Sequence, residues 1–215
     1  MNLINNLMLQ VKIKNKKQSG LDNFLNTYLS SLNSSITKMD KKKIYQAANL
    51  IEGVIKKNKT IYVCGNGGSA AIANHFICDY FKVLCMQTNL KAKVKSLCSD
   101  FELISAISND ISYDDIFLYQ AERLLSSGDL LILISSSGNS NNLKKVLQYA
   151  NQKKIKSIGF SGFKGGYLKK FSTVPVFSNI SNYGISEDIN HILMHLIMQY
   201  IKLKNIKSNN KNPLL

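Results

Sequence analysis

Two short apolar runs, each followed at once by a turn of glycine and serine, constrain the fold of this chain most. The first run is TIYVC at 60–64, and its turn is GNGGS at 65–69. The second run is LLILI at 130–134, and its turn is SSSGNS at 135–140. Short apolar strands with helix-like segments between them are typical of βαβ units and of a parallel sheet. The sequence therefore predicts an α/β fold with both turns at one edge of the sheet, where such folds bind ligands.

The spacing of apolar residues predicts the other elements. Strands are expected at 60–64, 94–97, 129–135, 156–161 and 173–178, and helices at 69–84, 100–108, 114–126, 139–152 and 186–204. Two further segments with helical spacing, 21–32 and 41–57, precede the first strand. They predict an N-terminal helical hairpin, in which Asp40 is the N-cap of the second helix.

The expected organisation is a single domain with two loose ends. Residues 1–20 are interpreted as a basic arm, 21–58 as the N-terminal helices, 59–204 as a parallel sheet of about five strands flanked by helices, and 205–215 as a loose basic tail. No apolar run is long enough to span a membrane, and the N-terminus lacks the pattern of a secretory signal. We therefore expect a cytoplasmic location, in which the 4 cysteines stay as reduced thiols.

The net charge of +15 comes almost entirely from lysine. Of the 28 basic residues, Arg123 is the only arginine. Base readout and bidentate phosphate recognition favour arginine over lysine. The lysines are therefore interpreted as a solvated surface and not as a nucleic-acid site.

Both glycine and serine turns have the chemistry of a phosphate site. Glycine lets the backbone approach a ligand closely, serine hydroxyls donate hydrogen bonds, and the start of the following helix attracts an anion. Neither turn is a Walker loop or a GxGxxG motif. Because two such turns follow successive predicted strands, the sequence predicts one site for a phosphorylated small molecule.

The 3 histidines of the chain all lie at helical spacing from a carboxylate. His75 is four residues before Asp79, and Glu187, His191 and His195 follow one another at intervals of four. Imidazole and carboxylate groups that converge from separate helices can bind a transition metal or act as an acid and base pair. Histidines that merely complete the hydrogen bonding of a helix are the alternative. The spacing does not choose between His191 and His195.

Most of the chain, from about Leu21 to Tyr200, resembles the sugar isomerase (SIS) domain family, and most closely its phosphoheptose isomerases. The matching segments are GNGGSAAIANHF at 65–76, ISND at 107–110, GDLLILISSSGNSNN at 128–142 and EDINHILMH at 187–195. The resemblance implies a metal-assisted aldose–ketose isomerase. It would convert sedoheptulose 7-phosphate to D-glycero-D-manno-heptose 7-phosphate for surface polysaccharide, and it would be a homotetramer with active sites between subunits.

The resemblance also implies the residues of the site. The expected substrate-binding residues are Asn66, Gly67, Gly68, Ser69, Asn109, Asp110, Ser135, Ser136, Ser137 and Ser140. The expected ligands of Zn²⁺, or of another divalent metal, are His75, Asp79, Glu187 and His195. Asp79, Glu187 and His195 are also the expected catalytic residues.

Three residues depart from the pattern of the family. Asp79 stands where a glutamate is usual, Glu187 where a glutamine is usual, and Gly184 where an aspartate is usual. The first two changes can compensate for each other, so either Asp79 or Glu187 can be the base. The departures leave two alternatives open: an isomerase of another phosphosugar, and a non-catalytic SIS tetramer that binds a protein partner.

Overall fold

A parallel sheet of five strands forms the centre of the protein, whose computed structural model describes residues 17–206. The strands lie in the order β2-β1-β3-β4-β5 and all neighbours are parallel. Their bounds are β1 Thr60–Gly65, β2 Lys93–Ser96, β3 Leu130–Ser135, β4 Lys156–Ser161 and β5 Val174–Phe177. The strands expected from the sequence are confirmed, because apolar and β-branched runs bury well in such a sheet.

The strand order places a topological switch point between β1 and β3. Ile61 of β1 pairs with Val94 of β2 on one side and with Leu130 of β3 on the other. The chain therefore leaves β1 in one direction and returns to build the sheet in the other. Ligands of open α/β sheets bind beyond the carboxyl ends of the strands at such a point. Both glycine and serine turns begin there.

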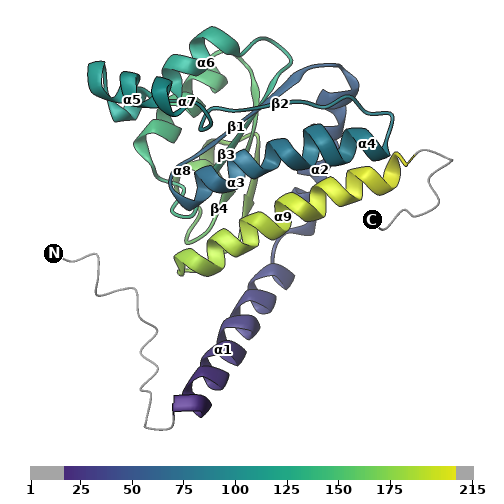
Figure 1. Cartoon of the computed structure of the whole chain (residues 1–215), viewed down its shortest axis with the longest axis vertical. Coiled ribbons are helices and arrows are strands. Elements are labelled where there is room, and N and C mark those ends of the chain that lie inside the picture. The colour runs from purple at the N-terminus through teal and green to yellow at the C-terminus, as the bar shows by residue number, and fades with distance from the viewer. Residues whose placement is uncertain (1–16, 207–215) are drawn as a thin grey trace.

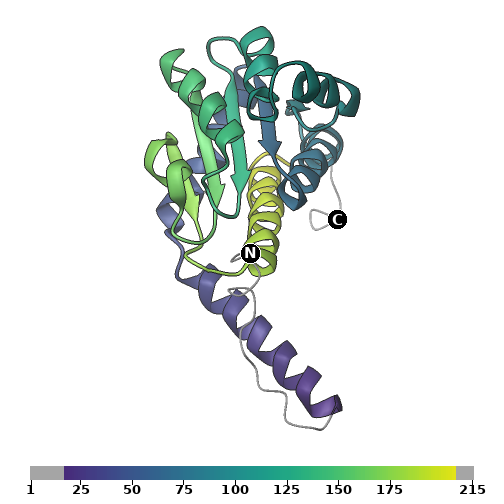
Figure 2. The same ribbon diagram turned by 90° about the vertical axis from the view of Figure 1, so that its left-hand side faces the viewer.

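Helices cover both faces of the sheet (Figure 1, Figure 2). One face packs against α2 (Lys41–Lys56), α3 (Gly68–Ile77), the π-helix η1 (Cys78–Leu84), α4 (Cys85–Gln87) and α9 (Tyr183–Lys204). The other face packs against α5 (Phe101–Asp110), the short 3₁₀ helix η2 (Tyr113–Asp115), α6 (Leu118–Leu124), α7 (Asn141–Gln152) and α8 (Gly166–Phe171). The side chains of β3 alternate between these layers, with Ile132 in the first core and Leu131 in the second. Within residues 17–206, no helix is long and apolar enough to cross a membrane.

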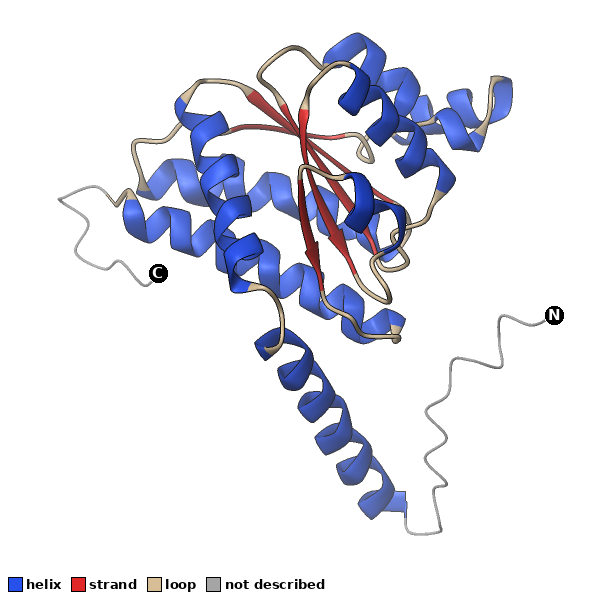
Figure 3. Ribbon diagram, turned by 180° about the vertical axis from the view of Figure 1, so that it is seen from behind, coloured by secondary structure: helices blue, strands red, loops and turns tan. Residues whose placement is uncertain are grey.

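The structure corrects the expected N-terminal hairpin. Helix α1 (Lys17–Thr37) begins before residue 21 and projects from the domain instead of folding back along α2 (Figure 1, Figure 3). A hairpin requires the apolar stripes of its two helices to face each other, but α2 buries its stripe in the core against the sheet. Asp40 caps α2 as expected, because its carboxylate accepts a hydrogen bond from Lys42 N at 2.9 Å. Most of the expected arm and tail, 1–16 and 207–215, lies outside the described residues.

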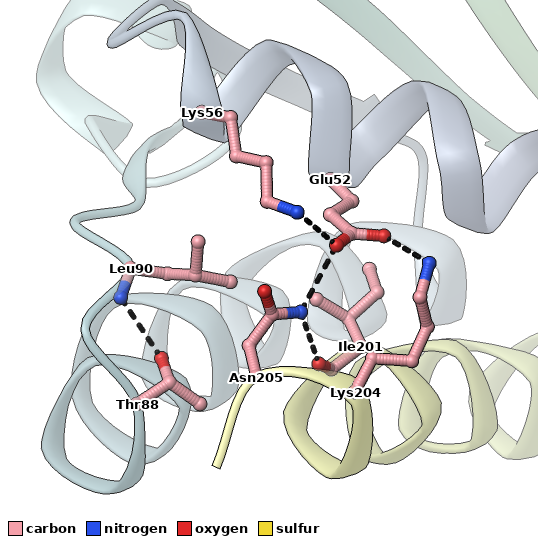
Figure 4. Close-up of polar contacts among 7 residues, drawn as sticks. All are labelled: Glu52, Lys56, Thr88, Leu90, Ile201, Lys204 and Asn205. Atoms are coloured by element: carbon pink, nitrogen blue, oxygen red, sulfur yellow. Dashed lines mark hydrogen bonds and ion pairs between the residues drawn. The ribbon is translucent and has the colours of Figure 1, made fainter. Parts of the chain in front are cut away.

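A buried carboxylate fastens the end of α9 to α2 (Figure 4). Glu52 of α2 accepts hydrogen bonds from Lys56 Nζ at 2.6 Å, from Lys204 Nζ and from Asn205 Nδ2 at 3.0 Å. Asn205 also donates to Ile201 O at 2.8 Å, which closes the last turn of α9. The interaction fixes the direction of α9 across this face of the sheet. The histidines of α9 are thereby held in place above α3.

The pKa of Glu52 reflects this pairing. Burial alone would raise the pKa, but the hydrogen bonds from Lys204, Lys56 and Asn205 and the charge of Lys204 outweigh burial and lower the pKa to about 2. The carboxylate is therefore ionised in the folded protein over the whole neutral and mildly acidic range.

We predict that Glu52→Gln lowers the free energy of unfolding at neutral pH by about 1–2 kcal/mol, because it removes charge-assisted hydrogen bonds whose lysine ends are partly exposed. The folded pKa of about 2 lies below the ordinary 4.5, so this stability is present above pH 4.5 and is lost as the pH falls from 4.5 towards 2. Urea unfolding of wild type and variant across this range measures the difference. The exposed Glu122→Gln is the control, and a Glu52 difference that stays constant with pH contradicts the prediction.

Candidate functional site

The turn after β1 depends on glycine. A Cβ on Gly65 would lie 2.8 Å from backbone atoms of Ser69, and Gly67 has a φ of +54°, in the left-handed region that favours glycine. Gly68 begins α3, and a Cβ there would lie 2.4 Å from the carboxylate of Glu187 on α9. The missing side chain at Gly68 therefore lets α9 bring its first carboxylate against the start of α3.

An amide bridge joins the two expected ligand loops. Asn66 and Asn142 each donate to the side-chain oxygen of the other at 2.9 Å, and Tyr113 donates to Asn66 Oδ1 at 2.9 Å. Asn142 is buried in the first turn of α7, just after the serine loop. The bridge therefore holds the turn after β1 beside the start of α7, and the two loops belong to one site.

The serine loop after β3 gathers hydroxyl groups at the N-terminus of α7. Ser135 Oγ lies 3.5 Å from both Ser137 Oγ and Ser140 Oγ, and it accepts a hydrogen bond from Gly138 N at 3.1 Å. Ser136 is buried and its carbonyl accepts from Gly162 N, which ties the loop to the end of β4. Hydroxyl groups and free backbone N–H groups at the start of a helix form a suitable cradle for phosphate.

Three residues of the expected metal site meet between α3, η1 and α9. His195 Nε2 lies 3.2 Å from His75 Nε2 and 3.1 Å from Asp79 Oδ2, and His75 Nε2 lies 3.5 Å from Asp79 Oδ1. Asp79 is buried, whereas the side chains of both histidines are partly exposed. Asp79 stands near the start of the π-helix η1, a type of segment that is frequent at functional sites. One edge of the group is thus anchored in the core and the other faces solvent.

His191 joins the same cluster. The ligand atoms of His75, His191 and His195 all lie within 4.8 Å of one another. The His191 ring stacks on His195 with centroids 4.7 Å apart and meets the edge of His75 at 5.0 Å. Burial, followed by the charges of His195 and His75, lowers the pKa of His191. This favours a neutral imidazole, the form that binds metals.

Glu187, by contrast, is not brought to the histidines. Its carboxylate lies beside Gly68, and it is two turns of α9, about 12 Å along the helix axis, from His195. Next to it, Asp188 accepts a hydrogen bond from Tyr28 of α1; burial and this bond raise the pKa of Tyr28 to about 12. A Cβ added to Gly184, one of the departures from the family, would lie 3.4 Å from the Tyr28 hydroxyl.

The expected substrate pair Asn109 and Asp110 lies at the exposed end of α5. Asn109 Nδ2 donates to Asp110 Oδ1 at 2.8 Å. Instead, Tyr113 of η2 reaches the glycine turn from this region. Neither Tyr113 nor Asn142 was among the site residues expected from the sequence. Asn142 lies in the segment 128–142 that resembles the family, so this resemblance could have identified it. No sequence pattern indicated Tyr113 as a site residue.

Comparison with known proteins identifies relatives of this chain. Residues 24–162 match the family model of the SIS domain. The chain is 33% identical to a phosphoheptose isomerase of Aliarcobacter butzleri, over 73% of this chain and 82% of the relative. It is 34% identical to a probable phosphoheptose isomerase of Thermoplasma acidophilum, over 75% and 88%. The solved structure of phosphoheptose isomerase from Neisseria gonorrhoeae superposes with a TM-score of 0.76 at 25% identity, covering 86% of this chain and 99% of that chain.

The geometry of the serine loop leads to a prediction about its glycine. Gly138 has a φ of +66°, and an added Cβ would lie 2.1 Å from the backbone oxygen of Gly165. We expect Gly138→Ala to lower the free energy of unfolding by about 2–4 kcal/mol, from backbone strain and from overpacking against a backbone atom that cannot rotate away. Chemical unfolding measures this loss.

Two matched glycines separate the two causes. Gly67→Ala carries a positive φ of +54° with nothing within 4 Å of the added Cβ, so strain alone should cost about 1–2 kcal/mol. Gly53→Ala, inside α2 with open space around it, should stabilise by about 0.5–1 kcal/mol. If Gly138→Ala and Gly67→Ala lose the same free energy of unfolding, the close approach of the serine loop to Gly165 does not contribute to the loss, and the prediction is wrong.

Proposed function

The chain belongs to the SIS domain family and is a sugar-phosphate isomerase, and we propose that its substrate is sedoheptulose 7-phosphate. The product is D-glycero-D-manno-heptose 7-phosphate, a precursor for surface polysaccharide. One observation carries the proposal: the serine loop, the glycine turn and the histidine cluster form a connected site at the switch point of a chain similar to phosphoheptose isomerases. We place the reaction in the cytoplasm, where free thiols such as the four cysteines persist.

The histidine cluster fits a divalent metal ion. Metal–nitrogen bonds of about 2.0–2.1 Å in a tetrahedral site place neighbouring ligand atoms about 3.3 Å apart. The separations among His75 Nε2, His195 Nε2 and the Asp79 oxygens, 3.1 to 3.5 Å, match this value. Two imidazoles and a carboxylate suit zinc and related transition ions. When bound, such an ion supplies a Lewis acid that stabilises negative charge on the oxygens of the substrate.

The serine loop binds the phosphate end of the sugar in this proposal. The hydroxyls of Ser135, Ser137 and Ser140 and the N-terminus of α7 provide donors without a buried positive charge. Gripping the phosphate fixes the far end of a seven-carbon chain. Binding energy gathered there orients the reacting carbons at the other end of the site, which is how remote groups contribute to turnover.

Glu187 is the group that we assign to proton transfer. An aldose–ketose isomerisation moves a proton between two adjacent carbons, and a carboxylate is a suitable carrier. Both Asp79 oxygens already face imidazoles. The Glu187 carboxylate makes no hydrogen bond or ion pair within residues 17–206, and it lies against the glycine turn. Asp79 then holds the histidines, and Glu187 acts on the substrate.

A non-catalytic SIS protein that binds a partner is the second candidate. Such a protein needs no convergence of imidazoles and a buried carboxylate. In this chain the 3 histidines form one cluster, and two of them, His75 and His195, approach the buried Asp79. This arrangement favours catalysis. An isomerase of another phosphosugar keeps the same chemistry, and the substrate assay distinguishes it.

We also propose that the protein assembles into a homotetramer through α1. The exposed side chains of Leu21, Phe24, Leu25 and Leu29 give α1 an apolar surface. An apolar groove of about 370 Å³ runs between the end of α1, α2 and α9. Exposed apolar surfaces of this kind mark sites of association. Because Tyr28 of α1 bonds to the residue next to Glu187, assembly and catalysis meet at the start of α9.

Turnover of sedoheptulose 7-phosphate by the zinc-loaded protein, followed by NMR, tests the function. We expect formation of the heptose 7-phosphate, and a loss of about 100-fold or more in turnover for Glu187→Gln. Gly68→Ala should also lower turnover, because its Cβ displaces the Glu187 carboxylate. Its stability should change little, since a flexible side chain can rotate away and alanine favours the helix.

The matched control is Asn74→Ala, an exposed residue of α3 that should leave turnover unchanged. Turnover of Glu187→Gln at the wild-type rate rejects Glu187 as the proton carrier. Binding of metal and phosphosugar without conversion rejects this substrate and favours another phosphosugar.

We predict that Phe24→Asp combined with Leu25→Asp lowers the mass of the assembly, because two charges replace apolar side chains on α1. Light scattering after size-exclusion chromatography measures the mass. Phe101→Asp places a charge on an exposed aromatic residue of α5 and serves as the control. An unchanged tetramer in the double variant, or a wild-type protein that is already a monomer, excludes assembly through α1.

A further inference from the structure

We propose that His191 is a metal ligand, and that it completes with His75, His195 and Asp79 a centre to which Glu187 does not belong. The inference rests on the proposed function in one respect only, the presence of a divalent metal ion in this cluster. It differs from the expectation drawn from the sequence, in which Glu187 took the fourth ligand position. Zinc is the metal that we commit to, because three imidazoles and a carboxylate are donors that it prefers.

The position of His191 on α9 supports this assignment. His191 and His195 are four residues apart, so both point from one face of the helix towards α3. Their ligand atoms and that of His75 all lie within 4.8 Å of one another. Small rotations of side chains close such a triangle to the separations of about 3.3 Å that a tetrahedral ion requires. Asp79 already has this separation from His195.

The bonding state of His191 is a second, independent observation. Its Nε2 atom is buried and has no hydrogen-bond partner within the described part of the chain. A buried polar atom without a partner is unfavourable by about 1–3 kcal/mol, and native proteins rarely tolerate one without a reason. A metal bond to this nitrogen satisfies it. Nothing else in the cluster does so, because the rings of His75 and His195 approach His191 edge-on and by stacking.

The position of Glu187 argues against its role as a ligand. His191 is one turn of α9, about 6 Å along the axis, from His195, whereas Glu187 is two turns away. The Glu187 carboxylate is pressed into the space that Gly68 leaves open at the start of α3. His75, the nearest histidine on that helix, stands seven residues further on. In this proposal the histidines and Asp79 bind the ion, and Glu187 is available to transfer a proton.

Zinc affinity of the full-length protein tests the proposal. Metal-free protein competes with a chromophoric chelator for Zn²⁺, and wild type is compared with His191→Ala, His191→Gln and Glu187→Gln. We expect both His191 variants to bind zinc at least about 10-fold more weakly, a loss at the lower end for groups that support a metal. Glu187→Gln should bind within about threefold of wild type.

Two measurements keep the result independent of folding and of activity. Circular dichroism and melting of the metal-free variants show whether each one folds, and His191→Gln keeps a side chain of similar polarity. Reconstitution with Co²⁺ then reports the ligands directly. We expect wild type and Glu187→Gln to give the same visible spectrum, and the folded His191 variants to give a different one.

Three outcomes overturn the proposal, and a fourth supports it while it rejects the substrate. Wild-type affinity and spectrum in the His191 variants exclude His191 as a ligand. A loss in Glu187→Gln as large as that in His191→Ala shows that Glu187 belongs to the centre. Absence of zinc binding in the wild type shows that the three rings pack together without a metal. Zinc binding that depends on His191, in a protein that does not convert sedoheptulose 7-phosphate, rejects only the substrate.

Discussion

The close packing of α9 along α3 is the interaction on which the site depends. Helix α9 carries Glu187, His191 and His195, while His75 stands on α3 and Asp79 follows it in η1. The two helices approach closely because Gly68 has no side chain, and because Ile189, Leu193 and Ile197 of α9 are buried in the core. At its other end, α9 is fastened to α2 through Glu52. A shift of α9 by one turn would move Glu187 to the height that His191 now has and His191 to the height of His195. The contacts of Glu52 and the missing side chain of Gly68 therefore help to determine which side chains of α9 lie beside His75.

The sheet contributes the second half of the site through its topology. The reversal of strand order between β1 and β3 brings two loops to one point, although some 70 residues of chain separate them. The Asn66–Asn142 bridge then joins the loops through a pair of reciprocal hydrogen bonds. The serine loop can thus bind a phosphate at one end while the histidine cluster stands at the other.

The parts of the structure that depend on interactions between residues close in the sequence could be predicted from the sequence. The strands at 60–64 and 129–135 could be predicted because burial in a parallel sheet demands short apolar runs, and Asp40 could be predicted as a cap because its carboxylate satisfies N–H groups two residues away. The direction of α1 could not, because an apolar stripe predicts a helix that packs but not the surface it packs on. The contact of Tyr113 with Asn66 could not be predicted either, because it joins residues far apart in the chain and produces no periodic pattern in the sequence.

Two of the three departures from the family pattern, those at 79 and 187, can be explained together once the helices are placed. A spacing of four residues predicted only that Glu187, His191 and His195 share a face; their height along α3 is a tertiary property. Asp79, one methylene shorter than the usual glutamate, reaches less far from η1 and stays beside His75 and His195. An additional imidazole from His191 then supplies a donor close to the same point. In the proposed centre the ligand position expected for residue 187 is not needed, and the glutamate there is the carboxylate that we assign to the substrate. The changes at 79 and 187 therefore read as one rearrangement of ligand and base, with His191 as the residue that makes it possible.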